Sequence, residues 1–161
     1  MRRTLDLLGW LALGVMAWVT YRAVWGPERL PDRIATHFDL AGSPNGWGSP
    51  AVLLVLPVIG VGVYLLMMAV CRYPAAFNYP VPVLPANRAR AEELTVAMVG
   101  WLKMELACFF ALLQWMIIDS ARRGQGKTLP LLMPPFLVVV FATIGWYTVA
   151  IIRLGKGKDG A

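Results

Sequence analysis

Residues 30–50 read LPDRIATHFDLAGSPNGWGSP, and they are the part of the chain that does not read as lipid-facing helix or short connector. The stretch contains His37, the only histidine, and its glycines and prolines set a defined backbone path. It lies between two long apolar segments. We therefore interpret it as the organising element of the fold, which the remaining chain holds at a membrane surface.

The composition predicts an integral membrane protein. The 161 residues are 58% hydrophobic and 15% charged, and the mean hydropathy is +0.61, which is too apolar for an ordinary soluble domain. A formal charge of +6 is compatible with nucleic-acid binding. However, the basic residues lie at the ends of apolar runs rather than on one face, so we expect no nucleic-acid partner.

Four apolar segments are long enough to span a bilayer, and helices are the form that satisfies the backbone of such segments in lipid. We expect one all-α membrane domain over residues 1–161, with helices at about 5–25, 51–71, 88–118 and 129–154. An outer cap is expected at 27–50 and a proline-rich inner connector at 72–87. The first segment lacks a clear small-x-small cleavage site, so we expect it to remain as an uncleaved helix.

Lysine and arginine residues predict the orientation of the helices. With the N-terminus in the cytoplasm, eight basic residues lie inside and five lie outside. We therefore expect both termini in the cytoplasm and residues 30–50 on the outside. The inner set is Arg2, Arg3, Arg72, Arg88, Arg90, Arg153, Lys156 and Lys158, and the outer set is Arg29, Arg33, Arg122, Arg123 and Lys127.

The cap has the pattern of a small folded unit. Residues 34, 36 and 38 alternate with residues 35, 37 and 39, which predicts a short strand. Residues 39–42 and 43–46 have turn composition, and Pro44-Asn45-Gly46 is the strongest turn signal. Ser49 suits a helix N-cap and Pro50 the first helical position, so the cap ends cleanly there.

Four polar residues interrupt the apolar segments: Arg22, Lys103, Glu105 and Gln114. Arg22 either extends to the outer surface or pairs with Asp39 or Asp119. Lys103 lies near the midplane or extends to the inner surface, depending on where the third span begins, and Glu105 is deeper. Lys103 and Glu105 point to nearly opposite faces, so each needs its own partner, whereas Lys103 and Gln114 share a face.

His37 and Asp39 allow two interpretations. An imidazole and a carboxylate on the same side of a strand could act as an acid–base or metal pair, with Asp32, Glu28 or Asp119 as the further ligands. Alternatively, His37 forms a hydrogen bond that fixes the shape of the cap. No catalytic motif and no metal-type spacing is present, and Cys71 and Cys108 are expected as free thiols, so we expect neither cofactor nor metal.

Residues 30–39, followed by Gly42, Pro44, Asn45 and the Gly46-Trp47-Gly48 step, resemble the signature of the domain-of-unknown-function 1648 family. In that family a Pro, an Ile, a Thr-His-Phe/Trp-Asn/Asp step, a Gly and a Gly-Trp-Gly step recur in the first outer loop. The domain also forms the N-terminal part of SdpI-like proteins. The resemblance thus implies a multi-helix bacterial membrane protein linked to immunity against a secreted peptide toxin or to signalling, although Pro50 stands here where a Lys is common.

Together these observations predict a non-enzymatic, multi-pass protein of the bacterial inner (cytoplasmic) membrane. Its outer cap is expected to recognise a peptide, a lipid or a partner membrane protein, and the sequence leaves the oligomeric state open. Two alternatives are a structural subunit of a membrane complex, and a membrane enzyme or ion-coupled carrier that uses His37, Asp39, Lys103 and Glu105. The expected binding residues of the cap are His37, Phe38, Asp39, Gly42, Asn45 and Trp47.

Overall fold

The computed structural model describes residues 2–39, 41, 43–124 and 129–155. It contains four helices that are long and apolar enough to span a membrane, together with one small two-stranded sheet, and this confirms the predicted fold class. The elements are α1 (Arg2–Val24), β1 (Ile34–Phe38), β2 (Pro44–Gly48), the 3-10 helix η1 (Pro50–Leu54), α2 (Val55–Val70), the 3-10 helices η2 (Pro74–Ala76) and η3 (Pro85–Asn87), α3 (Arg88–Arg123) and α4 (Leu129–Gly155).

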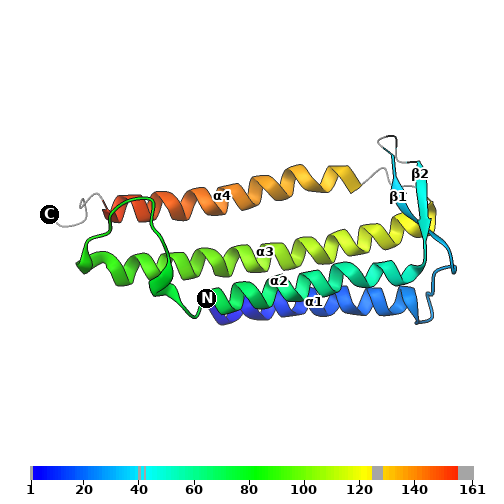
Figure 1. The fold of residues 1–161 in the computed structure, drawn as a ribbon, viewed down its shortest axis with the longest axis horizontal. Helices are drawn as coiled ribbons and strands as arrows, with labels where there is room; N and C mark the ends of the chain where they lie inside the picture. The colour runs from blue at the N-terminus through cyan, green and yellow to red at the C-terminus, as the bar shows by residue number, and fades with distance from the viewer. Residues whose placement is uncertain (1, 40, 42, 125–128, 156–161) are drawn as a thin grey trace.

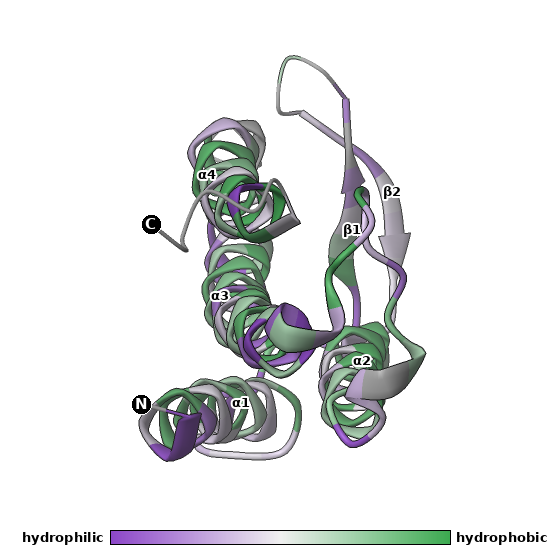
Figure 2. Cartoon of the chain, turned by 90° about the vertical axis from the view of Figure 1, so that its left-hand side faces the viewer, coloured by the Kyte–Doolittle hydropathy of each residue, from purple (hydrophilic) through white to green (hydrophobic). Residues whose placement is uncertain are grey.

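Helix α3 is the centre of the bundle. Helices α1 and α2 lie on one side of it and α4 lies on the opposite side, as both views show (Figures 1 and 2). Helix α4 therefore packs chiefly against α3 and leaves most of its apolar surface exposed to the surroundings. The start of α1 and the end of α4 lie at one end of the bundle, and the β1–β2 hairpin lies at the other (Figure 1).

Close approach between α1, α2 and α3 depends on Gly60 of α2. A Cβ atom there would lie 3.0 Å from the Met16 Cε atom and 3.1 Å from the Phe110 ring, so a larger residue would push the helices apart. Small residues at such contacts allow helices to pack closely in lipid. A Cβ atom at Gly62 of the same helix would have no neighbour within 4 Å, so Gly62 makes no such contact.

Helix α3 continues beyond the predicted end at residue 118 and ends at Arg123. Gly124 then adopts a left-handed conformation with φ of 65°, and its N–H donates to the Ser120 carbonyl. This is a common way to end a helix, because glycine has no Cβ to resist that conformation. The extra turn is charged, so it lacks the apolar signal on which the shorter prediction depended.

The hairpin corrects the predicted position of the turn. The pairs Ile34↔Gly48 and Ala35↔Trp47 establish an antiparallel ladder, so Pro44-Asn45-Gly46 belongs to strand β2 rather than to a turn. The chain reverses between Asp39 and Ser43 instead. The Asp39 N–H donates to the Ser43 carbonyl at 2.9 Å, and the Asp39 carboxylate accepts the Ser43 N–H at 2.9 Å. A proline at the first position of a strand is tolerated, which explains why the Pro44 signal was misleading.

The starts of η1 and α3 differ in their capping: Ser49 caps η1 as predicted, whereas the Asn87 side chain does not cap α3. Ser49 caps η1, since its Oγ accepts the Ala51 N–H at 3.3 Å, and Pro50 occupies the first position as expected. Asn87 precedes α3, but its side chain does not cap that helix. Its Nδ2 donates instead to the Leu154 carbonyl at 3.0 Å, which connects the start of α3 to the end of α4.

Candidate functional site

The hairpin packs on one end of the bundle through an apolar cluster. Ile34 at the start of β1 is 2% exposed and lies among residues from the segment before it, η1, α1 and α3. Burial of a large aliphatic side chain contributes about 1.5–3 kcal/mol, so this cluster holds the cap firmly on the helices. Its buried members are Ala23, Val24, Leu30, Ile34, Leu53 and Ile118.

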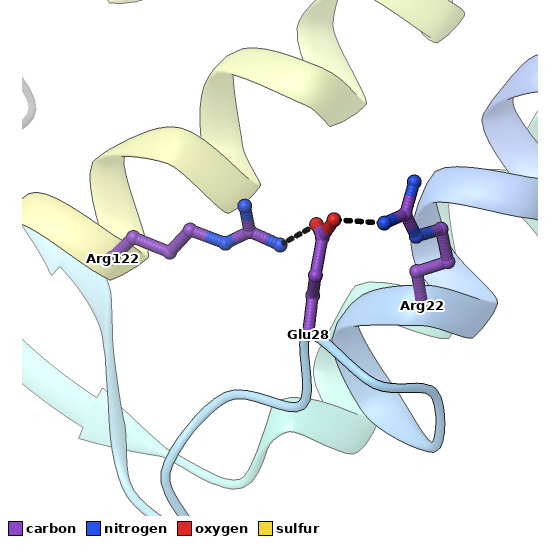
Figure 3. Close-up of polar contacts among 3 residues, drawn as sticks. All are labelled: Arg22, Glu28 and Arg122. Atoms are coloured by element: carbon purple, nitrogen blue, oxygen red, sulfur yellow. Dashed lines mark hydrogen bonds and ion pairs between the residues drawn. The ribbon is translucent and has the colours of Figure 1, made fainter.

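A second attachment is ionic. Glu28, in the segment that follows α1, lies between Arg22 of α1 and Arg122 of α3 (Figure 3). The Arg122 guanidinium donates to Glu28 Oε2 at 2.6 Å, and Arg22 binds the other carboxylate oxygen. The hydrogen bond from Arg122, assisted by the charge of Arg22, lowers the pKa of Glu28 from its ordinary value of 4.5.

The partner of Arg22 differs from both predicted partners. Asp39 forms the hairpin turn with Ser43, and Asp119 accepts a hydrogen bond from Arg123 at 3.0 Å, so neither carboxylate is available. The chain turns back immediately after α1 and brings Glu28 to Arg22 instead. The predicted role, which is to connect the outer segment to the bundle, nevertheless agrees with this geometry.

His37 lies across the hairpin from Asn45. Its Nδ1 atom is in hydrogen-bond contact with Asn45 Oδ1, and both side chains are exposed. An amide oxygen only accepts, so Nδ1 carries the proton in this contact. His37 thus joins the two strands, and the Asp39 carboxylate is directed to Ser43 rather than to His37.

The other predicted cap residues are distributed along the same hairpin. Trp47 is 53% exposed on β2 and offers a large apolar surface. Phe38 ends β1, while Gly42 lies outside the described residues. Within the described ranges, no three His, Cys, Asp or Glu side chains lie close enough together to hold a metal ion.

A pocket of about 240 Å³ lies beneath strand β1, and it was not predicted from the sequence. Its walls are chiefly apolar side chains from β1, η1, α2 and α3, and its polar lining residues are Thr36 and Gln114. Because the pocket forms between segments that are far apart in the chain, no local pattern marks it. The residues that line it are Ile34, Ala35, Thr36, Val52, Leu53, Val55, Leu56, Ile59, Gln114 and Ile117.

Gln114 is fully buried and leaves one polar atom without a partner. Its Nε2 donates to Thr20 Oγ1 and to the Leu53 carbonyl, both at 2.9 Å. The Leu53 carbonyl can only accept, and the Thr20 hydroxyl already donates to the Met16 carbonyl, so these contacts require the amide nitrogen. Oε1 is therefore the buried atom with no hydrogen-bond partner.

Lys103 finds its partner on α1. Its Nζ lies 2.6 Å from Asp6 Oδ1 and 4.8 Å from the centre of the Tyr64 ring, and the residue is 3% exposed. Tyr64 in turn donates from its hydroxyl to the Asp6 carbonyl at 3.0 Å. Lys103 is thus paired inside the bundle and does not extend alone to the inner surface.

Glu105 points the other way, toward α4, where Glu105 Oε1 accepts a hydrogen bond from Thr143 at 2.6 Å. The four residues of the carrier alternative consequently lie in three places. His37 and Asp39 are on the hairpin, Lys103 is between α1 and α3, and Glu105 is between α3 and α4. They do not line a common cavity.

Comparison with known proteins supports the sequence resemblance. The chain is 27% identical over 129 residues to an uncharacterized protein of Archaeoglobus fulgidus, and the alignment covers 71% of this chain and 69% of the relative. No solved structure matches the chain significantly. The family described as "Domain of unknown function (DUF1648)" matches residues 11–61, which include most of α1, the hairpin, η1 and the start of α2. Residues 11–61 of this protein therefore resemble the DUF1648 domain.

Proposed function

We propose that this protein is a non-enzymatic receptor for an extended apolar peptide segment, and that the hairpin and the pocket beneath β1 bind that segment. The observation that carries the proposal is the buried, unpaired Oε1 of Gln114, a residue that lines this mostly apolar pocket. A buried acceptor without a partner costs about 1–3 kcal/mol, and a ligand that donates an N–H group recovers this energy. A peptide offers such a donor beside each apolar side chain.

The hairpin supplies a second means of recognition. In the part of the chain that the structure describes, β1 and β2 pair only with each other, so each strand has one unpaired edge. An open edge accepts an added strand through main-chain hydrogen bonds, while adjacent pockets select its side chains. This combination favours a peptide over a lipid, because an acyl chain cannot use the strand edge.

The Arg22–Glu28–Arg122 group keeps the hairpin in position for binding. It joins the segment before β1 to both α1 and α3, so the receptor surface is attached at fixed points on two helices. A rigid receptor loses less conformational entropy when the ligand binds.

The cellular setting is part of the same proposal. We place the protein in the cytoplasmic membrane with the hairpin outside and both termini inside, which the excess of basic residues at the opposite end supports. The physiological role we propose is immunity to a secreted peptide or sensing of one, in the manner of SdpI-like proteins.

Two valines of α2 provide a matched test. Val55 lines the pocket and is 54% exposed, whereas Val58 is 72% exposed and does not line it. We would select apolar decapeptides from a displayed library against the full chain in lipid nanodiscs, and then measure the affinity of selected peptides for Val55→Phe and Val58→Phe. Filling the pocket should weaken binding by about tenfold or more, and Val58→Phe should bind like the wild type.

Two results would count against the receptor proposal. One is the absence of any peptide that binds the protein better than empty nanodiscs. The other is equal affinity for the wild type and Val55→Phe.

A further inference from the structure

Glu105 occupies the middle of the bundle. It lies 17 residues after Arg88, the start of α3, and 18 residues before Arg123, its end. At about 1.5 Å per residue, either end of the helix is about 26 Å away. Its partner Thr143 lies similarly near the middle of α4. The carboxyl group is therefore at the depth where ionisable residues are rare and usually functional.

Glu105 differs from the other acidic residues of the helices. Asp6, Glu92, Glu93 and Asp119 each pair with a lysine or arginine, whereas Glu105 has no basic partner within the described ranges. Its Oε1 accepts the Thr143 hydrogen bond, but its Oε2 is buried and has no partner at all. Within the described residues, the fold thus leaves the Glu105 carboxylate without a basic partner in the middle of the bundle.

The surroundings of Glu105 are aromatic. A groove of about 500 Å³ between α3 and α4 is lined by Trp101, Ala142, Thr143, Trp146 and Tyr147 in addition to Glu105. Helix α4 lies at the outside of the bundle against α3 (Figure 2). Trp146 is 77% exposed, so the groove borders the surface that faces lipid. A ligand dissolved in the membrane can reach it from the side.

We propose that this groove binds a lipophilic organic cation of single positive charge, such as a quaternary ammonium or arylphosphonium compound. The cation's charge compensates Glu105, and its apolar groups lie against the indole and phenol rings. Aromatic faces attract such cations, and the attraction is strongest where water is excluded. An inorganic ion such as Ca²⁺ takes about six to eight oxygen ligands, which the Glu105 carboxylate and the Thr143 hydroxyl do not supply.

The test uses tetraphenylphosphonium and the full chain in nanodiscs, with empty nanodiscs to subtract partition into lipid. Equilibrium dialysis should show saturable binding to the wild type. Glu105→Gln keeps the size of the side chain and removes its charge, so we expect binding about tenfold weaker or undetectable. Trp146→Leu changes an exposed residue, and we expect a loss of about 2- to 30-fold.

Two control variants match these substitutions. Asp119→Asn removes an acid from the same helix outside the groove, and Trp18→Leu removes an exposed tryptophan from α1; both should bind like the wild type. A neutral isosteric analogue of tetraphenylphosphonium should bind the wild type and Glu105→Gln equally. Size-exclusion profiles identify any variant that fails to fold.

The proposal is overturned if the wild type shows no saturable binding, or if a folded Glu105→Gln protein binds the cation as tightly as the wild type. Neither outcome bears on peptide recognition by the hairpin, because the two sites share no residue.

Discussion

Lys103 is a buried charge between α1 and α3. It is 3% exposed, and its Nζ is 2.6 Å from the carboxylate of Asp6. Removing one member of a buried ion pair leaves the other charge without compensation. We therefore expect Asp6→Asn to destabilise the protein by about 3 kcal/mol or more, as measured by denaturant unfolding in detergent with tryptophan fluorescence.

Asp119→Asn is the natural control for this measurement. Its partner Arg123 has a side chain that is 72% exposed, and exposed pairs of this kind contribute about 0–1 kcal/mol. If Asp6→Asn and Asp119→Asn destabilise the protein equally, the Lys103–Asp6 pair contributes no more to stability than an exposed pair. The double variant Asp6→Asn with Lys103→Met should recover much of the loss, because no unpaired charge remains.

The individual polar residues show which features of a site local sequence patterns can predict. The depth of Glu105 and the separate faces of Lys103 and Glu105 follow from the helical repeat alone. The Lys103–Asp6 pair does not, because its members are 97 positions apart and meet only when α1 packs against α3. The free Oε1 of Gln114 was unpredictable for the same reason, since its existence depends on contacts with both α1 and η1.

The attachment of the hairpin should depend on pH through Glu28. Its folded-state pKa lies below the ordinary value of 4.5, so the interaction stabilises the attached cap above the unfolded-state value and is lost as the pH falls through the folded-state pKa. The protection factors of the β1 amides, which correct the exchange rates for their intrinsic dependence on pH, should therefore fall below about pH 4.5 in the wild type.

Glu28→Gln isolates this effect. A neutral side chain cannot titrate, so the β1 amides of this variant should have lower protection factors than those of the wild type near pH 7 and should lose little further protection on acidification. If the protection factors of Glu28→Gln still fall on acidification as those of the wild type do, the pH dependence belongs to another group.

Single elements were predicted well where the sequence shows a regular alternation or a residue pair typical of a helix start. The alternation over residues 34–38 marked strand β1, and Ser49-Pro50 marked the start of a helix. The turn at residues 43–46 was wrong because Pro44, Asn45 and Gly46 have turn composition wherever they occur, whereas Asp39 supplies the hydrogen bonds that close the actual reversal. The end of α3 was placed too early because its last turn is charged rather than apolar.

At the scale of the molecule, four long apolar segments were enough to predict the helical membrane fold. The arrangement of the four helices could not be predicted, because apolarity alone does not specify which helix lies at the centre. The central place of α3 follows from packing on both of its sides, and it is also what directs Lys103 toward α1 and Glu105 toward α4.

The proposed orientation can be tested with single cysteines in a background without Cys71 and Cys108. Ala41 is exposed in the hairpin turn, and Arg72 is exposed at the opposite end of the bundle. We expect a membrane-impermeant maleimide added to intact cells to label a cysteine at position 41 and not one at position 72, because the positive-inside rule places the basic end in the cytoplasm. The reverse pattern would place the hairpin inside.

The most direct test of peptide recognition is to map where a selected apolar peptide contacts the protein. A photoreactive group on the peptide, followed by mass spectrometry of the cross-linked chain in nanodiscs, identifies the residues that it touches. The proposed function predicts adducts on β1 and the start of α2, around Thr36 and Val55, with loss of these adducts in Val55→Phe. Adducts confined to α4, or spread evenly over the lipid-facing surface, would contradict it.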